Sequence, residues 1–182
     1  MFGCNPVMVM SSQSEWTSTE YAYTDIEQVS GITFSDIGID HIKSKSSNTP
    51  SGLTRDLSGL RIFDADSPSY NHSGWKQNND YWTYSGLDAN TQYGIRGKSR
   101  NGDGDETSIC SIHYIFTLAN TPVAPFVHNA TSTTVELDIE DDGNPSYTEY
   151  AIFNSTLGQW ISSNGSHTSN KVWRTDSDWG KT

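Results

Sequence analysis

The segment Gly86–Tyr93 constrains the fold of this chain more than any other. It carries a turn signal of Gly, Asp and Asn and ends on a tyrosine. The following residues, through Ser99, alternate as a β-strand does, and Asn101–Gly104 supplies a second turn rich in Gly and Asp. The order of turn, tyrosine, strand and turn predicts one corner of an antiparallel β-structure.

This pattern resembles the E–F corner and F strand of a fibronectin type III domain. In that family the corner tyrosine is hydrogen-bonded to upstream backbone and fixes one end of a β-sandwich, and here that residue is Tyr93. The resemblance covers residues 31–182 and includes the junction Leu118–Pro125. It implies an all-β fold of fibronectin type III-like units in tandem, which is a scaffold with no active site of its own.

Two pairs of similar segments support a repeat. Trp75–Trp82 is similar to Trp173–Trp179, and Leu60–Asp64 is similar to Tyr150–Asn154. Spacings of about 90–100 residues agree with a unit of sandwich size. Many fibronectin type III domains carry a tryptophan in the second strand, and the expected second strands here have none. Trp82 and its repeat partner Trp179 are the expected substitutes in the core.

The boundary between the units falls at Thr117–Pro125. Pro122 and Pro125 stiffen the backbone and cannot donate to a β-ladder, as expected of a short linker. We therefore expect three parts: an irregular lead-in or the end of a preceding module at residues 1–30, a fibronectin type III-like domain at 31–118, and an incomplete second one at 119–182.

Short apolar or alternating runs between polar turns give the expected strands. In the first unit these are residues 32–40, 41–46, 60–63, 81–84, 93–99 and 108–118, and in the second unit 134–140, 148–154 and 158–162. Val135, Leu137 and Ile139 alternate with acidic and hydroxyl residues, which predicts a strand with one face on a core. In the lead-in, Val7–Met10 is a candidate strand.

The second unit is predicted to be incomplete. Trp82 is followed by the corner and two further strands, whereas Trp179 is followed only by Gly180–Thr182. A sandwich without those strands leaves unpaired backbone groups and an uncovered core. We expect this unit to be marginally stable unless a second chain or another segment, such as Val7–Met10, supplies the missing strands.

Composition narrows the classes of partner. The formal net charge of −11 and the pI near 4.6 predict no nucleic-acid binding, because the chain repels phosphate backbones. The aromatic content of 12% indicates a packed β-protein rather than a disordered chain. No stretch approaches the ~20 apolar residues that span a bilayer, so membrane insertion is not expected.

The sequence contains no recognisable catalytic, cofactor-binding or metal-binding motif, so we expect a protein that is not an enzyme and has no cofactor. The chain has neither a phosphate-binding loop nor a nucleophile elbow. The histidines lack metal-ligand spacing; they are His41, His72, His113, His128 and His167.

Two acidic segments leave calcium binding open as an alternative to ordinary turns. Asn101, Asp103 and Asp105 copy the start of an EF-hand loop, but Glu106 and Ile112 stand where that motif needs Gly and Glu. The turn interpretation is favoured, since Gly, Asp and Asn supply positive φ angles. The second acidic segment presents the same alternative with Asp138, Glu140, Asp141 and Asp142. Cys4 and Cys110 leave a single disulfide open.

Two functions follow as expectations. The first is a non-catalytic spacer or adhesion module of a secreted or cell-surface multidomain protein, with neighbouring domains in a longer chain and an unidentified protein or glycan ligand. The second is an accessory, carbohydrate-binding region of a secreted polysaccharide-degrading enzyme. Trp160 is the candidate sugar platform for that role, because Trp75, Trp82, Trp173 and Trp179 occupy repeat-equivalent places and are expected to be structural.

Overall fold

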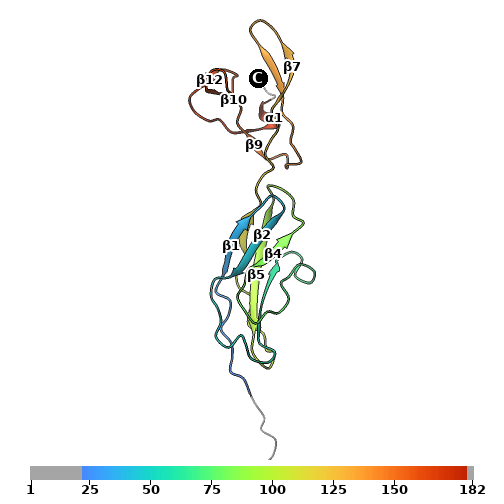
Figure 1. Ribbon diagram of the computed structural model, residues 1–182, viewed down its shortest axis with the longest axis vertical. Coiled ribbons are helices and arrows are strands. Elements are labelled where there is room, and N and C mark those ends of the chain that lie inside the picture. Colours follow the sequence, from blue (N-terminus) through green and yellow to red (C-terminus); the bar gives the residue numbers. More distant parts are fainter. Residues whose placement is uncertain (1–21, 180–182) are drawn as a thin grey trace, which may run out of the picture.

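The computed structural model describes residues 22–179 of the chain, in two parts stacked along one long axis (Figure 1). The first part is built from strands β1 to β6 and the second from β7 to β13 with one helical turn. The described chain enters at the far end of the first part, and the second part lies at the opposite end. None of the helices among the described residues is long and apolar enough to cross a membrane.

The first part is a sandwich of two three-stranded antiparallel sheets. One sheet has the order β1-β2-β4 and the other β3-β5-β6. The strand bounds are β1 Ile32–Ile37, β2 His41–Ser46, β3 Gly59–Asp64, β4 Trp82–Ser85, β5 Gln92–Arg100 and β6 His113–Phe116. The all-β prediction is confirmed, and each expected strand of this part is present. The first and the sixth are shorter than expected, because residues 38–40 turn into β2 and residues 108–112 and 117–118 are not in a strand.

Apolar side chains from both sheets form the core. Its buried members are Val29, Ile32, Ile42, Leu53, Leu60, Ile62, Tyr84, Leu87, Ile95 and Cys110. Trp82 packs against this core and stacks on Tyr84, with ring centroids 5.3 Å apart. Trp82 is therefore one of several aromatic side chains at the core, whereas the core-facing residues of the second strand are Ile42, Ser44 and Ser46.

The described part of the lead-in, residues 22–30, has no regular secondary structure and lies against the first part. Val29 is 1% exposed, and the Ser99 hydroxyl donates to the Glu27 carbonyl at 2.5 Å. The candidate strand Val7–Met10 lies outside the described residues.

The second part consists of small, separate ladders. Strands β7 (Phe126–Ala130) and β8 (Val135–Asp138) form a hairpin that projects from the molecule (Figure 1). The remaining elements are β9 Glu149–Tyr150, β10 Phe153–Asn154, β11 Gln159–Ile161, β12 His167–Thr168, β13 Arg174–Thr175 and α1 Asp176–Trp179. Between residues 119 and 179 only Asn144, Thr148 and Tyr150 are buried.

Two expectations for the second part are wrong. Val135 and Leu137 were expected to face a core, but they are 59% and 38% exposed, because no second sheet covers the β7–β8 hairpin. Trp179 was expected to match Trp82, but it lies in the helical turn α1, whereas Trp82 lies in a strand. Strand β3 is likewise continuous where its counterpart is split into β9 and β10.

Candidate functional site

The joint between the two parts is the best-defined candidate site. Residues 119–125 connect them without forming a strand. Asn144 holds this linker through both ends of its side-chain amide: its oxygen accepts from the Asn120 N–H at 2.7 Å, and its nitrogen donates to the Asn120 carbonyl at 3.2 Å. Asp142 accepts a further bond from the Val123 N–H at 2.9 Å. The linker is therefore fixed to the second part at two points.

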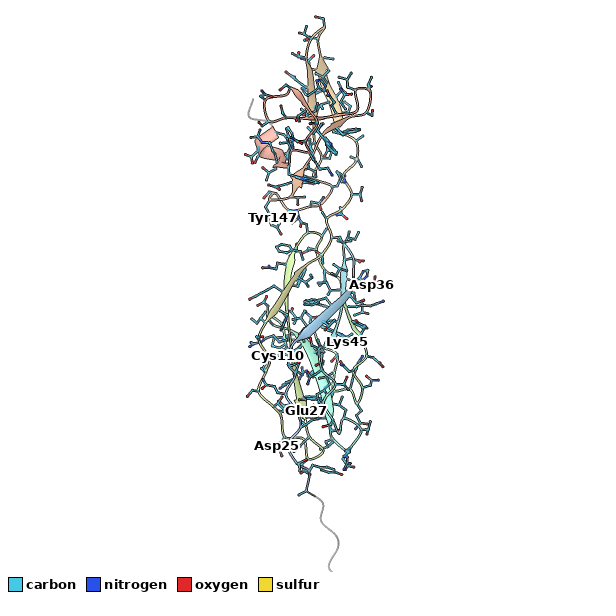
Figure 2. All side chains as sticks on the ribbon, turned by 90° about the vertical axis from the view of Figure 1, so that its left-hand side faces the viewer. Asp25, Glu27, Asp36, Lys45, Cys110 and Tyr147 are labelled. Atoms are coloured by element: carbon cyan, nitrogen blue, oxygen red, sulfur yellow. The ribbon has the colours of Figure 1, made fainter. Side chains whose placement is uncertain are left out.

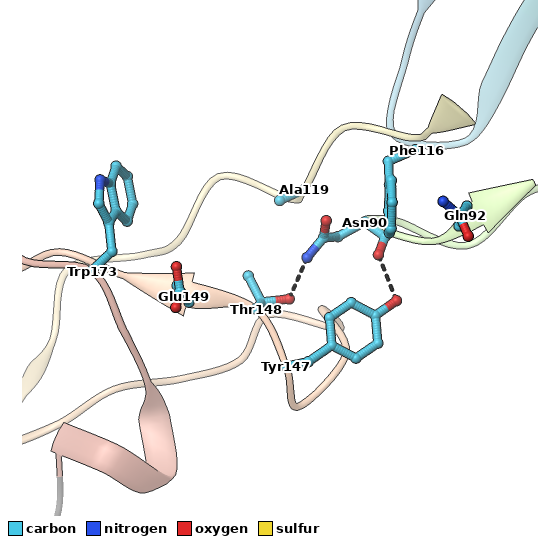
Figure 3. Close-up of a pocket in the computed structure, with 8 residues that line it drawn as sticks. All are labelled: Asn90, Gln92, Phe116, Ala119, Tyr147, Thr148, Glu149 and Trp173. Atoms are coloured by element: carbon cyan, nitrogen blue, oxygen red, sulfur yellow. Dashed lines mark hydrogen bonds between the residues drawn. The ribbon is translucent and has the colours of Figure 1, made fainter. Parts of the chain in front are cut away.

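A second set of bonds joins the turn before β5 to the second part (Figure 3). The Tyr147 hydroxyl donates to the Asn90 carbonyl at 2.7 Å, and the Asn90 side-chain amide donates to the Thr148 hydroxyl at 2.8 Å. Asn90 has a positive φ of 46°, a conformation that asparagine tolerates better than most residues. Its carbonyl and amide thereby both face the second part. Tyr147 lies at the waist of the molecule (Figure 2).

An open cleft of about 810 Å³ lies beside these bonds. It is lined by Asn90, Gln92, Phe116, Ala119, Tyr147, Thr148, Glu149 and Trp173. Phe116 and Trp173 are 46% and 55% exposed, so their rings form accessible apolar walls. The amides of Asn90 and Gln92 and the carboxylate of Glu149 supply polar groups between them. Exposed rings with nearby amide and carboxylate groups present an apolar face and hydrogen-bonding atoms to a ligand.

Burial perturbs one ionisable side chain close to the joint. Tyr150 is 7% exposed, and this burial raises the pKa of its phenol. Its hydroxyl donates to the Asp141 carbonyl at 3.1 Å, within the turn that also carries Asp142. The neutral phenol is therefore a structural donor that ties β9 to this turn.

The Asn101–Glu106 segment forms a turn closed by its own asparagine. The Asn101 side-chain oxygen accepts from the N–H groups of Asp103 and Asp105, at 3.1 and 2.8 Å, and Gly104 has a φ of 95°. One oxygen of Asp103 accepts from the Tyr23 N–H at 3.0 Å. The Asn101 oxygen and one Asp103 oxygen are thus engaged with backbone, and one Asp105 oxygen accepts from the Asn101 side-chain amide at 3.3 Å.

The second acidic segment is also engaged locally. Asp138 lies 3.2 Å from the His128 ring, and Asp141 accepts from the Gly143 N–H at 3.0 Å. Over residues 22–179, no three His, Cys, Asp or Glu side chains are placed to hold a metal ion.

The tryptophans have contacts that differ from those expected. Trp160, the predicted sugar platform, packs on Phe153 with centroids 4.8 Å apart, and the Lys171 ammonium lies over its ring. Trp75 is covered by the Arg100 guanidinium at 4.5 Å. Trp173 is 55% exposed and lines the cleft, and the same Lys171 ammonium lies 5.3 Å from its ring centroid.

Cys110 is a free, buried cysteine, and Cys4 lies outside the described residues. The Cys110 sulfur accepts from the Gly97 N–H at 3.2 Å, and burial raises the pKa of its thiol. In the described structure this side chain has a packing role within the sandwich core.

Sequence reasoning missed the residues that build the joint. Asn90 lies in the turn before β5, Asn120 in the linker, and Asn144 and Tyr147 in the segment before β9, and no short motif relates them. The one available signal was Asn144-Pro145 beside an acidic turn, which marks a loop but not its partner.

Comparison with known proteins adds no further assignment. No family model matches this chain, and no curated protein is significantly similar to it.

Proposed function

We propose that this chain is a non-catalytic spacer and adhesion module of a secreted or cell-surface multidomain protein, built from fibronectin type III-like units. The observation that carries this proposal is the joint. Three side chains of the second part, those of Asp142, Asn144 and Tyr147, bond to backbone of the linker or the first part. A joint with fixed hydrogen bonds keeps two units extended, where a flexible linker would let them fold back on each other.

Small-angle X-ray scattering of the full chain tests this role. We expect the maximum dimension of an end-to-end particle, with little dependence on salt. Tyr147→Phe and Asn90→Ala together remove both bonds of the second set, and we expect a broader distribution of dimensions. Tyr114→Phe is the matched control, because Tyr114 is 60% exposed on β6 and makes none of the hydrogen bonds of the joint. A compact or freely jointed parent chain would contradict the proposal.

The second candidate function is carbohydrate binding as an accessory region of a polysaccharide-degrading enzyme. The exposed rings of Trp173 and Phe116 in the cleft favour it, since sugars stack on accessible aromatic faces. Retention on insoluble polysaccharides is the test. We expect Trp173→Ala to abolish retention, and Phe126→Ala, at a 66% exposed ring on the distant hairpin, to preserve it. Equal retention of both variants would rule the cleft out.

A further inference from the structure

One face of the β3-β5 ladder carries a cluster of cations in a chain whose net charge is −11. Arg61 of β3 lies directly opposite Lys98 of β5, and Phe63 lies opposite Arg96. Residues that are directly paired across a ladder, and residues two apart along one strand, lie on the same face of a sheet. Arg61, Arg96 and Lys98 therefore share a face, and Arg100 is the next residue of β5 on that face. The core residues Leu60, Ile62 and Ile95 occupy the other face.

A groove of about 320 Å³ lies over these cations. It is lined by Arg61, Phe63, Ala65, Pro68, Ser69, Arg96, Lys98 and Ile109. The loop after β3 supplies Pro68 and Ser69 on one wall, and Ile109, 43% exposed, contributes an accessible apolar surface. The groove therefore combines three positive charges with apolar walls and a hydroxyl group.

Backbone carbonyls hold two of the guanidinium groups in place. Arg61 donates from Nη2 to the Pro68 carbonyl at 2.8 Å, and Arg96 donates from Nε to the Cys110 carbonyl at 3.1 Å. The position of Cys110 is marked in Figure 2. A carbonyl orients a guanidinium without neutralising its charge, so N–H groups on the terminal Nη nitrogens that bond no carbonyl stay available to an anion. The buried Nε of Arg61 has no hydrogen-bond partner among the described residues.

Within residues 22–179, only one cation of this cluster has a carboxylate partner. Lys98 pairs with Glu106. Arg61, Arg96 and Arg100 form no ion pair with a described carboxylate, and the Arg100 guanidinium instead lies over the Trp75 ring. Like charges directly across a ladder destabilise the sheet. The Glu106 carboxylate and the Trp75 ring offset part of this repulsion, but the charges of Arg61 and Arg96 have no carboxylate partner among residues 22–179, as is common at binding sites.

We propose that this groove binds the carboxylate of a hexuronate residue in an acidic polysaccharide. The fixed guanidinium groups of Arg61 and Arg96 match the planar, two-oxygen geometry of a carboxylate. Pro68 and Ile109 provide the apolar surface against which a sugar ring packs, and the groove has room for about one ring. Charges beyond about 8–10 Å are screened at physiological salt, so the acidic remainder of the protein does not prevent this local contact.

This inference goes beyond the spacing role, which the scattering experiment tests separately. The full chain is titrated at low and physiological salt with oligogalacturonate, with a neutral glucan and with poly-glutamate. We expect binding of oligogalacturonate that weakens with salt, and none of the glucan. Arg96→Gln and Arg61→Gln are each expected to weaken binding at least about tenfold, as for the loss of a charge-assisted bidentate contact.

Arg55→Gln is the matched control, because it removes the same group from an exposed loop outside the groove. We expect less than about a twofold effect from it, since a distant exposed charge is screened. Thermal unfolding of each variant verifies folding, and Arg61→Gln is expected to keep or raise the melting temperature because it relieves repulsion with Lys98. Absence of oligogalacturonate binding, or equal losses in Arg55→Gln and Arg96→Gln, would overturn the proposal. Tighter binding of poly-glutamate than of oligogalacturonate would also overturn the proposed glycan ligand and would indicate an acidic peptide instead.

Discussion

The phenolic oxygen of Tyr93 accepts a hydrogen bond from the backbone N–H of Asp88 at 2.9 Å. The tyrosine is the second residue of the long strand β5, and the aspartate lies in the turn before this strand. The ring of Tyr93 also packs edge-on against the ring of Tyr84, with the two centroids 5.8 Å apart. This is the contact expected of a corner tyrosine, and it ties the start of β5 to the turn that connects β5 with β4 of the other sheet.

Replacing Tyr93 by phenylalanine is expected to lower the free energy of unfolding by about 1 kcal/mol. The ring packing survives, but the Asp88 N–H loses its acceptor; because Asp88 is exposed, water replaces part of the bond. Urea unfolding followed by fluorescence measures the change. Tyr70→Phe is the control, since Tyr70 is 89% exposed, and its effect is expected to be negligible. Equal effects at both positions would show that the corner bond contributes nothing.

The stability of the first part is expected to fall at alkaline pH through Tyr84. Burial, followed by the bond that its hydroxyl donates to Asp64, raises the pKa of this phenol well above its usual value of 10.0. The stability that the protonated phenol contributes is present in full below pH 10.0, where the phenol is protonated in both the folded and the unfolded chain. Above that pH the unfolded chain loses the proton first, so stability declines as pH rises.

Melting temperatures between pH 8 and 11 test this expectation, with the Tyr84→Phe variant as reference. The variant lacks the ionisable group and is expected to show a shallower alkaline decline. Parallel curves for the two proteins would contradict the assignment of the effect to Tyr84.

The lead-in contributes to the stability of the first part through Val29. This side chain is 1% exposed and belongs to the core, so Val29→Ala is expected to cost about 2 kcal/mol. Ile39→Ala, at a side chain that is 44% exposed, is the control and is expected to cost much less. Chemical denaturation of both variants measures the difference. A negligible effect at Val29 would show that the sandwich is complete without residues 22–30.

The second part is expected to open far more readily than the first. Amide hydrogen exchange in residues 134–160 should be much faster than in 93–118, because the β7–β8 hairpin has no buried side chain and stands apart from the other ladders. Asn144→Ala is expected to accelerate exchange in the second part further. The backbone N–H and carbonyl of Asn120 then both lose the Asn144 side-chain amide as their partner. Equally slow exchange in both parts of a monomer would refute the marginal stability of the second part.

Local patterns were sufficient to predict the first part of the fold. Alternation around Tyr93 and in residues 41–46 located β5 and β2, because in each case one face is buried and the period of two is visible in the sequence. The same reasoning failed at Val135 and Leu137. Alternation predicts a strand there, and β8 exists, but it cannot reveal whether another sheet covers the apolar face.

The joint and the cationic groove depend on contacts between distant segments. Asn90 and Tyr147 lie far apart in the chain, and Arg61 meets Lys98 only through the register of β3 and β5. Neither relationship follows from residue type or local spacing, since both require the paired backbone. The lead-in is a similar case, because Val29 lies in a segment without periodicity and is buried only by the assembled sandwich.

The end-to-end arrangement has a mechanical consequence. The strands of the first part run along the long axis of the molecule (Figure 1), and its first and last strands, β1 and β6, belong to different sheets. Tension between the two ends therefore acts parallel to the strands, across ladder bonds that lie perpendicular to them. Such a load must break many hydrogen bonds of the sandwich at the same time. The joint has only the few hydrogen bonds around Asn90 and Asn120, and these can break one after another. Under force, the joint and the second part are expected to yield first, while the sandwich remains folded.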